Sequence, residues 1–305
     1  MGRVVIPKRF KDKLGEDSFV YTLCNNVENI LDLPMIYFRE YTKHDESHIN
    51  NILKISDALI ANETLAALSK NAVEILVASC IIHDLGMFIQ KDGVESLLFG
   101  RHKGKKIALL DKLTWGEAWT DFYKKARRYN SHQLKSLFGD NPPPIHLPED
   151  HVDDANENWR VYGEFLRRYH PRIACDIVYY GFMGNIDTDI IENCAPENPT
   201  FTKDMIGLIC QSHGMSLRAT YGYIESLTYV RKESSHFPLG VPVYYLMSVL
   251  RLADYLHAGK KRAPIIRLTA DTVDSPLSRN EFMWNQAVDG LSEYSDKPSN
   301  VIYER

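Results

Sequence analysis

The chain has 305 residues, of which 44% are hydrophobic and 25% are charged, a balance typical of a folded soluble protein with one large domain or two ordinary ones. Its formal net charge of -4 argues against a surface adapted as a whole to nucleic acid, although local basic patches are compatible with it. The longest apolar run, residues 75–82, is far shorter than the roughly 20 residues that a membrane helix needs.

The N-terminus and the cysteines together predict a cytoplasmic location. Residues 1–13 lack the apolar core of a secretory signal, and the sixth position does not carry the Ser or Thr of a myristoylation signal. The cysteines are odd in number and include no CxxC pair, which predicts reduced core thiols rather than disulfides or a zinc finger. They are Cys24, Cys80, Cys175, Cys194 and Cys210.

Two helices are expected near the N-terminus, the first at about residues 18–31. The sequence from Thr42 to Asp45 fits a capping box, so the second helix should begin there and run to about Ala61. His48 stands one turn before the apolar stripe of this helix and therefore heads it. The stripe consists of Ile52, Ile55, Leu59 and Ile60.

Residues 74–90 read EILVASCIIHDLGMFIQ and predict a helix with a nearly continuous apolar body, with His83 and Asp84 near its C-terminal end. Asp84 continues an apolar face, so its carboxylate should be buried, which costs several kcal/mol without a partner. The neighbouring imidazole suggests a metal ion as that partner. A buried salt bridge or a satisfied core histidine would explain the pair alone equally well, because a second such pair, His44–Asp45, shows that these dipeptides occur without a shared role.

Residues 91–156 contain a basic segment whose aromatic residues recur at helical spacing and which ends in a proline run at 142–144. We interpret it as a helical insertion closed by a polyproline turn. A basic, aromatic insertion favours a polyanionic substrate, whereas a solvated helix face is the ordinary alternative. The basic residues include Arg101, Lys103, Lys124, Lys125, Arg127 and Arg128, and the aromatic residues are Trp115, Trp119, Phe122 and Tyr123.

The next predicted helices place two more histidines at helix ends. Pro171 disfavours helical geometry at the preceding residue, so His170 should stand at a junction between a helix from Trp159 and a new one. His213 continues the apolar stripe of a helix at 204–213 and is followed by a glycine suited to a helix end.

The C-terminal third adds a second carboxylate on an apolar face, Asp254, in a predicted helix at 241–257. The last forty residues are compatible with a short strand at 265–268 and predict a helix near 280–290. Because neither an internal repeat nor a regular series of strands is present, the chain is predicted to be mostly α.

Six residues share one property: each lies on the buried stripe of a predicted helix or at its end. A single histidine on an apolar face is more often a core residue than a ligand, but six such residues on five helices could converge within a bundle. In chain order they are His48, His83, Asp84, His170, His213 and Asp254.

This order resembles the HD superfamily of metal-dependent phosphohydrolases. The core pattern of that superfamily matches His48, the pair His83–Asp84, and Asp254, and the additional histidines of its two-metal members would be His170 and His213. The stretches YTKHDESHI, CIIHDLG, RRYHPRIA, QSHG and LRLADYLHAGKKRAP further resemble an HD subgroup found in bacterial proteins ahead of an Hsp90-like ATPase module.

The resemblance covers about residues 35–290. It implies an all-α HD domain at 41–290 that contains the basic helical insertion at about 91–156, preceded by an entry segment at 1–40 and followed by a tail at 291–305. Since no glycine-rich lid or nucleotide motif of the ATPase follows, we expect a free-standing version or a part of a longer protein.

The implied site binds one or two divalent ions. Imidazole and carboxylate ligands suit Mn, Fe, Ni, Co or Zn better than Mg alone, although Mg could accompany them. Asp84 would be the catalytic residue, because it can bridge two ions about 3.5–4 Å apart. A one-ion site would use only His48, His83, Asp84 and Asp254, and His44 would contact these ligands rather than an ion.

Four basic residues are predicted to bind the substrate: Arg101, Lys103, Arg127 and Arg251. Arg251 lies one turn before Asp254, where it could orient that carboxylate or meet a phosphate, and the sequence does not decide between the two.

The leading functional hypothesis is a phosphohydrolase or phosphodiesterase acting on a nucleotide, a signalling nucleotide or single-stranded nucleic acid. The alternatives are a metal-binding regulatory or interaction domain with little intrinsic hydrolase activity, and a structural helical domain without metal. The resemblance also implies an Hsp90-like ATPase module in the same system as a partner, and no membrane is expected.

Overall fold

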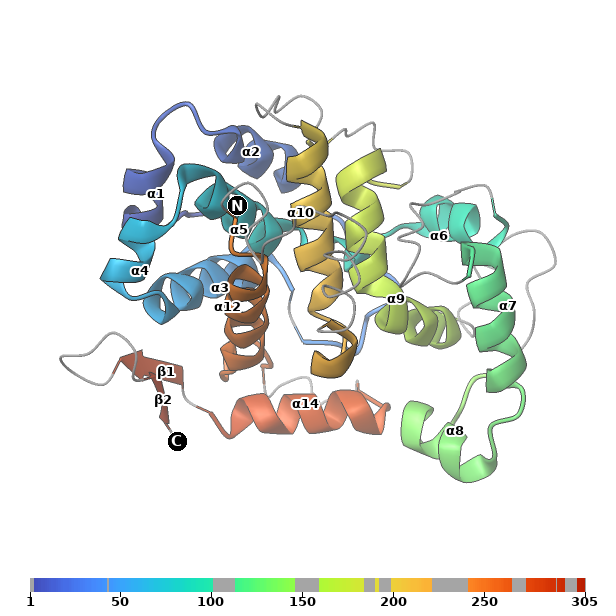
Figure 1. The fold of residues 1–305 in the computed structure, drawn as a ribbon. Helices are drawn as coiled ribbons and strands as arrows, with labels where there is room; N and C mark the ends of the chain where they lie inside the picture. The colour runs from blue at the N-terminus through green and yellow to red at the C-terminus, as the bar shows by residue number, and fades with distance from the viewer. Residues whose placement is uncertain are drawn as a thin grey trace.

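The computed structural model describes residues 3–42, 44–100, 113–145, 159–183, 190–191, 199–220, 241–264, 273–288, 290–293 and 301–304. In these ranges helices make up the fold apart from one short hairpin, which confirms the predicted all-α class (Figure 1). The division into entry segment, domain and tail stays a prediction.

The N-terminal part consists of four helices, and the second predicted helix begins later than expected. Asp45, not Thr42, precedes its first turn, and the Asp45 carboxylate accepts the Ser47 N–H at 3.1 Å. An aspartate satisfies a free N–H of the first turn as well as a threonine does, so the later cap prevails. The helices are α1 Lys8–Leu14, α2 Phe19–Leu31, α3 Glu46–Leu59 and α4 Asn62–Ala67.

The central helix is α5, Lys70–Ile82, followed by a 3₁₀ turn, η1, Leu85–Phe88. The prediction of one helix over 74–90 was therefore wrong in both bounds. Ser69 caps the start of α5 by accepting the Ala72 N–H, and the α-helix stops before His83. Figure 1 shows α5 surrounded by other helices, and it packs against α1, α2, α3, α10 and α12.

The stretch Lys70–Phe88 is long and apolar enough to cross a membrane by length and composition, but 89% of the 18-residue window that meets this criterion is buried inside the protein. Burial of this degree is what the core helix of a globular bundle shows, and it is consistent with a soluble protein.

The segment after η1 forms helices α6 Lys91–Leu98, α7 Trp115–Ala126 and α8 Ser131–Phe138. The aromatic side chains of α7 face inward: the rings of Trp119 and Phe165 lie 5.1 Å apart, edge to face. Because they are buried, these aromatic residues contribute to the core and do not offer exposed faces for stacking on a nucleic acid.

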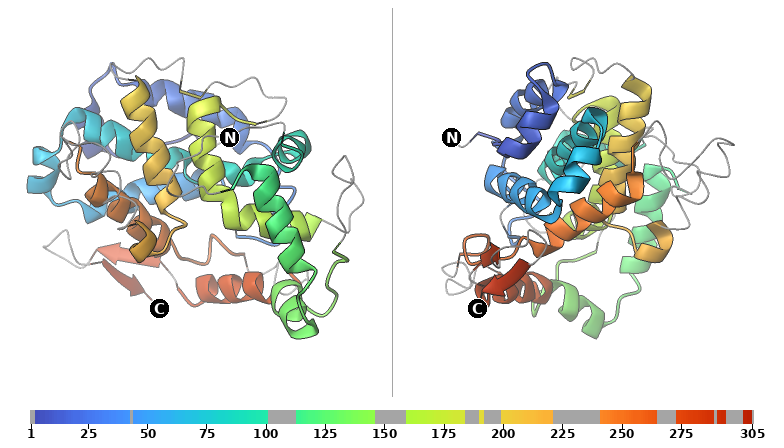
Figure 2. Two further views of the ribbon diagram at one scale, coloured as in Figure 1. Left: turned by 45° about the vertical axis from the view of Figure 1, so that its right-hand side comes forward. Right: turned by 60° about the vertical axis from the view of Figure 1, so that its left-hand side comes forward.

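Helix α9 spans Trp159–Tyr180 and contains Pro171 in its interior. The predicted break into two helices at His170 was therefore wrong. Figures 1 and 2 show instead that α9 bends along its length, as helices with an internal proline do. His170 consequently projects from within a helix rather than from a junction.

The remaining helices are α10 Pro199–Ser212, α12 Val243–Leu256 and α14 Pro276–Gln286. The helix predicted near 280–290 begins and ends earlier than expected, and the strand predicted at 265–268 lies outside the described residues. Strands β1 Gly290–Glu293 and β2 Val301–Glu304, which the sequence did not indicate, pair antiparallel with Gly290 opposite Glu304.

Helix α10 packs along both α9 and α5, and α12 packs on α3, α5 and α10. The start of α3 and the ends of α5, α10 and α12 are thereby brought to one region beside the middle of α9. The predicted site residues lie in this region.

Candidate metal centre

The structure brings the six predicted residues together in two groups, each able to offer ligand atoms within 4.8 Å of one another. The first ligand set is His48, His83, Asp84 and Asp254; the second ligand set is Asp84, His170 and His213. The two sets share Asp84. The convergence expected from the sequence is thus observed, while the binding of ions by these residues stays a prediction.

Helix ends position most of these side chains. His48 lies in the first turn of α3, His83 directly follows α5, and Asp254 lies in the last turn of α12. Asp84 has φ -107° and ψ 3°, in the bridge region of backbone space, where helical hydrogen bonding stops and active-site residues are often found. The chain therefore turns at Asp84.

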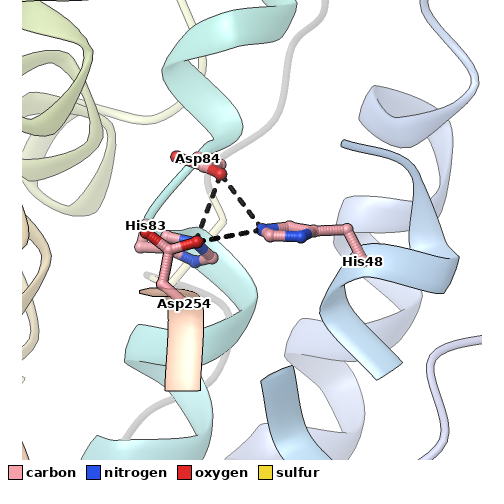
Figure 3. Close-up of side chains that lie close together, drawn as sticks. All are labelled: His48, His83, Asp84 and Asp254. Atoms are coloured by element: carbon pink, nitrogen blue, oxygen red, sulfur yellow. Dashed lines mark hydrogen bonds and ion pairs between the residues drawn. The ribbon is translucent and has the colours of Figure 1, made fainter. Parts of the chain in front are cut away.

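The first ligand set is largely buried. His48 and His83 have no exposed surface, and their Nε2 atoms each lie 3.2 Å from Asp84 Oδ2. Asp254 Oδ1 lies 3.7 Å from His48 Nε2 and 4.0 Å from His83 Nε2. Figure 3 shows all four side chains pointing toward one space from three sides.

The second ligand set uses the other oxygen of the shared carboxylate. Asp84 Oδ1 lies 3.3 Å from His170 Nε2 and 3.5 Å from His213 Nε2. The side chain of His170 is 18% exposed, so this ligand lies closer to solvent than His48 and His83, which are fully buried. Asp84 thus presents one oxygen to each set, which is the arrangement of a bridging carboxylate.

Backbone carbonyls fix the tautomers of three of these histidines. The Nδ1 atoms of His83, His170 and His213 lie 2.9, 2.8 and 2.5 Å from carbonyl oxygens three residues earlier. A carbonyl oxygen only accepts, so each Nδ1 must carry the proton and donate. In its neutral form each ring then turns the lone pair of Nε2 toward Asp84, as in histidines that bind metals.

The proline inside α9 explains the orientation of His170. Pro171 has no N–H, so it cannot donate to the carbonyl of Arg167, four residues earlier. His170 Nδ1 donates to that same carbonyl at 2.8 Å. The residue that was expected to break the helix therefore frees the acceptor that holds the histidine ring.

The donor set fits a cation. His170 Nε2 and His213 Nε2 lie 2.8 Å apart, and His48 Nε2 and His83 Nε2 lie 3.4 Å apart. Two facing lone pairs beside a carboxylate repel one another unless a cation or a proton lies between them. Ligand atoms about 2.1 Å from one ion lie roughly 3.0–3.4 Å apart in octahedral or tetrahedral geometry, close to these spacings.

In the metal-free protein, His83 takes a proton in place of an ion. Burial acts to lower its pKa, but the charge of Asp84 and the hydrogen bond to it outweigh burial and raise the pKa of His83 to about 9. Burial conversely acts to raise the pKa of Asp84, and the surrounding imidazoles hold that pKa well below its usual range. Asp84 is therefore ionised at neutral pH despite its burial.

Four other imidazoles near the centre, those of His44, His48, His213 and His257, have lowered pKa values and are neutral at neutral pH. Burial, reinforced by the Arg262 guanidinium, lowers the pKa of His48 well below its usual range, that of His44 to about 3 and that of His257 to about 4. Burial also lowers the pKa of His213. Neutral imidazole is the form that binds a metal ion.

Three further residues complete the surroundings, and the sequence indicated only His44 among them. His44 Nδ1 donates to the Thr42 carbonyl, and Arg262 Nη2 donates to His44 Nε2 at 3.0 Å. Both ring nitrogens of His44 are thereby engaged, and its Nε2 lies 3.8 Å from Asp84 Oδ2, while its role at the centre stays a prediction. His257 Nδ1 lies 2.7 Å from His48 Nδ1.

His257 and Arg262 escaped the sequence analysis because nothing in the stretch LHAGKKRAP marks either residue as different from an ordinary helix-end residue. The one available signal for His257 was its position, three residues after the predicted ligand Asp254 and in the last turn of the same predicted helix.

The predicted substrate-binding residues are only partly described. Arg101 and Lys103 lie outside the described residues. Arg127 is exposed at the end of α7, with its guanidinium 5.8 Å from the Tyr123 ring. Arg251 donates to the Ser212 carbonyl and to Thr220 Oγ1, so it ties α12 to the end of α10 beside His213. A role in substrate binding stays a prediction for all four.

Comparison with known proteins gives one family and no individual relative. Searches of curated proteins and of solved structures found no match. The HD-CE family model matches residues 38–303, which include both ligand sets, His257 and Arg262. Because this match extends over most of the chain, the protein belongs to the HD-CE family.

Proposed function

We propose that this protein is a metal-dependent phosphohydrolase or phosphodiesterase that hydrolyses a phosphate ester of a nucleotide or nucleic acid. The carrying observation is the position of Asp84, which directs one carboxylate oxygen at each of two histidine-containing ligand sets. A shared carboxylate between two such sets is the arrangement expected of a two-ion site for phosphoryl chemistry.

The residues of the centre have distinct roles in this proposal. Divalent ions in such a site polarise the phosphoryl oxygen and lower the pKa of water. Asp84 supplies negative charge to both sets, and Asp254 adds a second carboxylate to the first. The histidines, with their Nε2 lone pairs directed inward, hold the remaining positions.

Solvent exposure supports an approach of the substrate from the side of Asp254 and His170. Their side chains are 28% and 18% exposed, whereas His48 and His83 are fully buried. The phosphate ester would therefore meet the second ligand set and the outer edge of the first. Exposed basic residues at the C-terminal end of α7 and directly after it, including Arg127, would add positive charge for an anionic substrate.

The test is a hydrolysis screen of the purified protein. Nucleotides, cyclic nucleotides and single-stranded oligonucleotides are incubated with the protein loaded with Mn, Ni or Mg, after metal content is measured by mass spectrometry. We expect one or two bound transition ions per chain and hydrolysis of at least one phosphate ester. The Asp84→Asn variant should be inactive on the same ester.

Two outcomes would argue against this function. Protein that binds metal but hydrolyses none of these substrates would favour a regulatory domain, and protein that binds no ion would end the metal hypothesis. An Hsp90-like ATPase module as partner and a cytoplasmic location stay proposals. The second is supported by the burial of Cys24, Cys80, Cys175 and Cys210, which is typical of reduced core thiols.

A further inference from the structure

One ligand of the first set differs from the others in what holds its ring. His83, His170 and His213 each donate Nδ1–H to a backbone carbonyl. For His48 the described part of the chain offers no such carbonyl; its Nδ1 faces His257 Nδ1 at 2.7 Å, 209 residues away in the chain. The two rings lie 4.8 Å apart between centroids, tilted by 40°.

Only one proton can lie between two nitrogens at this distance, so one ring donates and the other accepts. His48 Nε2 points at Asp84, His83 and Asp254, and binding an ion there requires its lone pair. The proton of neutral His48 must then be on Nδ1. His257 must accept that proton and carry its own on Nε2.

The surroundings hold His257 in position to accept. It directly follows the last residue of α12, three positions after Asp254, and its N–H donates to the carbonyls of Ala253 and Asp254. Arg262 Nη1 donates to the His257 carbonyl at 2.7 Å. The backbone of His257 is therefore held at both its N–H and its carbonyl oxygen. Arg262 donates to that carbonyl and not to Nδ1 of the imidazole, which faces His48.

We infer that His257 is a positioning residue for the first ligand set: it accepts the Nδ1–H of His48 and thereby holds the His48 ring in the tautomer and orientation that binds an ion. Hydrogen-bond partners of this kind orient metal-binding histidines and raise their basicity. His257 itself does not bind the ion, because its Nδ1 lies on the far side of His48. This inference rests on the proposed metal centre.

The experiment measures metal binding, not activity. The His170→Ala/His213→Ala background leaves the first ligand set alone, and Zn²⁺ affinity is measured by competition with a chromophoric chelator. Into this background we introduce His257→Asn, His257→Leu and His257→Ala. Asparagine offers a carbonyl oxygen close to the position of Nδ1, and leucine fills the volume without an acceptor.

We expect His257→Ala and His257→Leu to bind Zn²⁺ about 10–100-fold more weakly, the usual loss for such partners, and His257→Asn to stay within about threefold of the parent. His132→Ala, an exposed histidine on α8, is the matched control and should have no effect. Circular dichroism and thermal melts of the metal-free proteins check that each variant is folded.

Parent-like affinity of the leucine or alanine variant would overturn the inference, as would an asparagine variant that is folded but as weak as leucine. If His257 only filled space in the packing, His257→Asn would not bind Zn²⁺ more tightly than His257→Leu. If the parent background itself binds no Zn²⁺, the proposed metal centre fails rather than the role of His257 alone.

Discussion

The two ligand sets are built differently, although they share Asp84. The first uses fully buried histidines at the start of α3 and the end of α5, together with a second carboxylate. Among the described residues, the second has no carboxylate of its own; it uses His170, beside the proline of α9, and His213, just past the end of α10.

The difference teaches that one centre can combine two kinds of support. In the first set the packed interior fixes the side chains. In the second set the proline inside α9 and the end of α10 position the two histidines, and His170 is more exposed than His48 and His83. We therefore expect the first set to hold its ion tightly and the second to exchange its ion and receive the substrate. The following predictions test this contrast, from the largest expected effect to the smallest.

Replacing Asp84, which both ligand sets share, should weaken metal binding at both sets and so remove the difference between them. Asp84→Asn keeps the volume but removes the negative charge from both sets, so metal occupancy should fall at both and turnover should drop by on the order of 10³–10⁴-fold. Metal content and kcat measure this. Asp140→Asn, at an exposed site paired with Lys135, is the control. A folded Asp84→Asn protein with normal turnover would rule out the two-metal mechanism.

Removing each set separately should give unequal results. The His170→Ala/His213→Ala protein should retain one tightly bound ion and a residual activity of roughly one hundredth or less, because the second ion contributes to transition-state stabilisation. The His48→Ala/His83→Ala protein should lose tight binding entirely. Ion stoichiometry by mass spectrometry after dialysis distinguishes them. If the first of these variants keeps two ions, His170 and His213 are core or substrate-contacting residues instead.

Gly214, next to His213, allows the second ligand set to be tested without replacing any of its ligands. A Cβ added at Gly214 would overlap the Pro171 ring, so Gly214→Ala must shift either the backbone beside His213 or the proline beside His170, and we expect the spacing of these two histidines to change. We expect roughly tenfold weaker binding of the second ion, unchanged first-ion binding, and about 1–3 kcal/mol of lost stability from overpacking. Gly116→Ala, where an added Cβ meets only an ordinary contact, is the matched control. Equal weakening of both ions would contradict the separate support of the sets.

The metal-free protein should be most stable near pH 6.5. Below this value the unfolded chain takes up protons that buried His257 and His44, with folded pKa values of about 4 and 3, do not, so stability falls as the pH drops. Above it the folded protein still holds the His83 proton that the unfolded chain has lost, and this stabilisation disappears as the pH rises through about 9.

Bound metal should abolish the alkaline loss of stability, because an ion replaces the proton on His83. Melting temperatures between pH 4 and 9.5, in chelator and with Zn²⁺, test both statements. A melting temperature of the metal-free protein that keeps rising up to pH 9 would contradict the charged state assigned to His83.

The smallest effects should come from the basic surface. Arg127→Ala and Lys103→Ala should each raise KM for an anionic substrate about two- to threefold at low salt, make binding less sensitive to salt, and leave kcat unchanged. Steady-state kinetics at two salt concentrations test this. A fall in kcat at constant KM would instead place these residues at the reacting groups.

Periodicity and residue chemistry predicted much of this molecule. Apolar stripes identified the main helices, and the type and order of His48, His83, Asp84 and Asp254 identified residues that do converge. Both signals are local or depend on residue type alone, so they can be read without knowing the packing.

The failures arose where tertiary contacts decide. Pro171 was expected to end a helix, but packing of α9 against α10 and a side-chain donor to the freed carbonyl allow the helix to continue. His257 was missed because its role depends on His48, more than 200 residues earlier. The sequence favoured Thr42 as the N-cap of α3, but Asp45 takes that position. The side chain of either residue can accept a hydrogen bond from an N–H of the first turn.

The carbonyl acceptors of the centre also determine which substitutions it tolerates. His83, His170 and His213 are held by the main chain of Cys80, Arg167 and Cys210. Every amino acid supplies the same carbonyl, so natural variation at these three positions would leave the tautomers unchanged. The support for His48 comes from a side chain, and that position cannot vary as freely. Among HD-CE proteins, diversity should therefore accumulate beside three of the histidines and be restricted opposite the fourth.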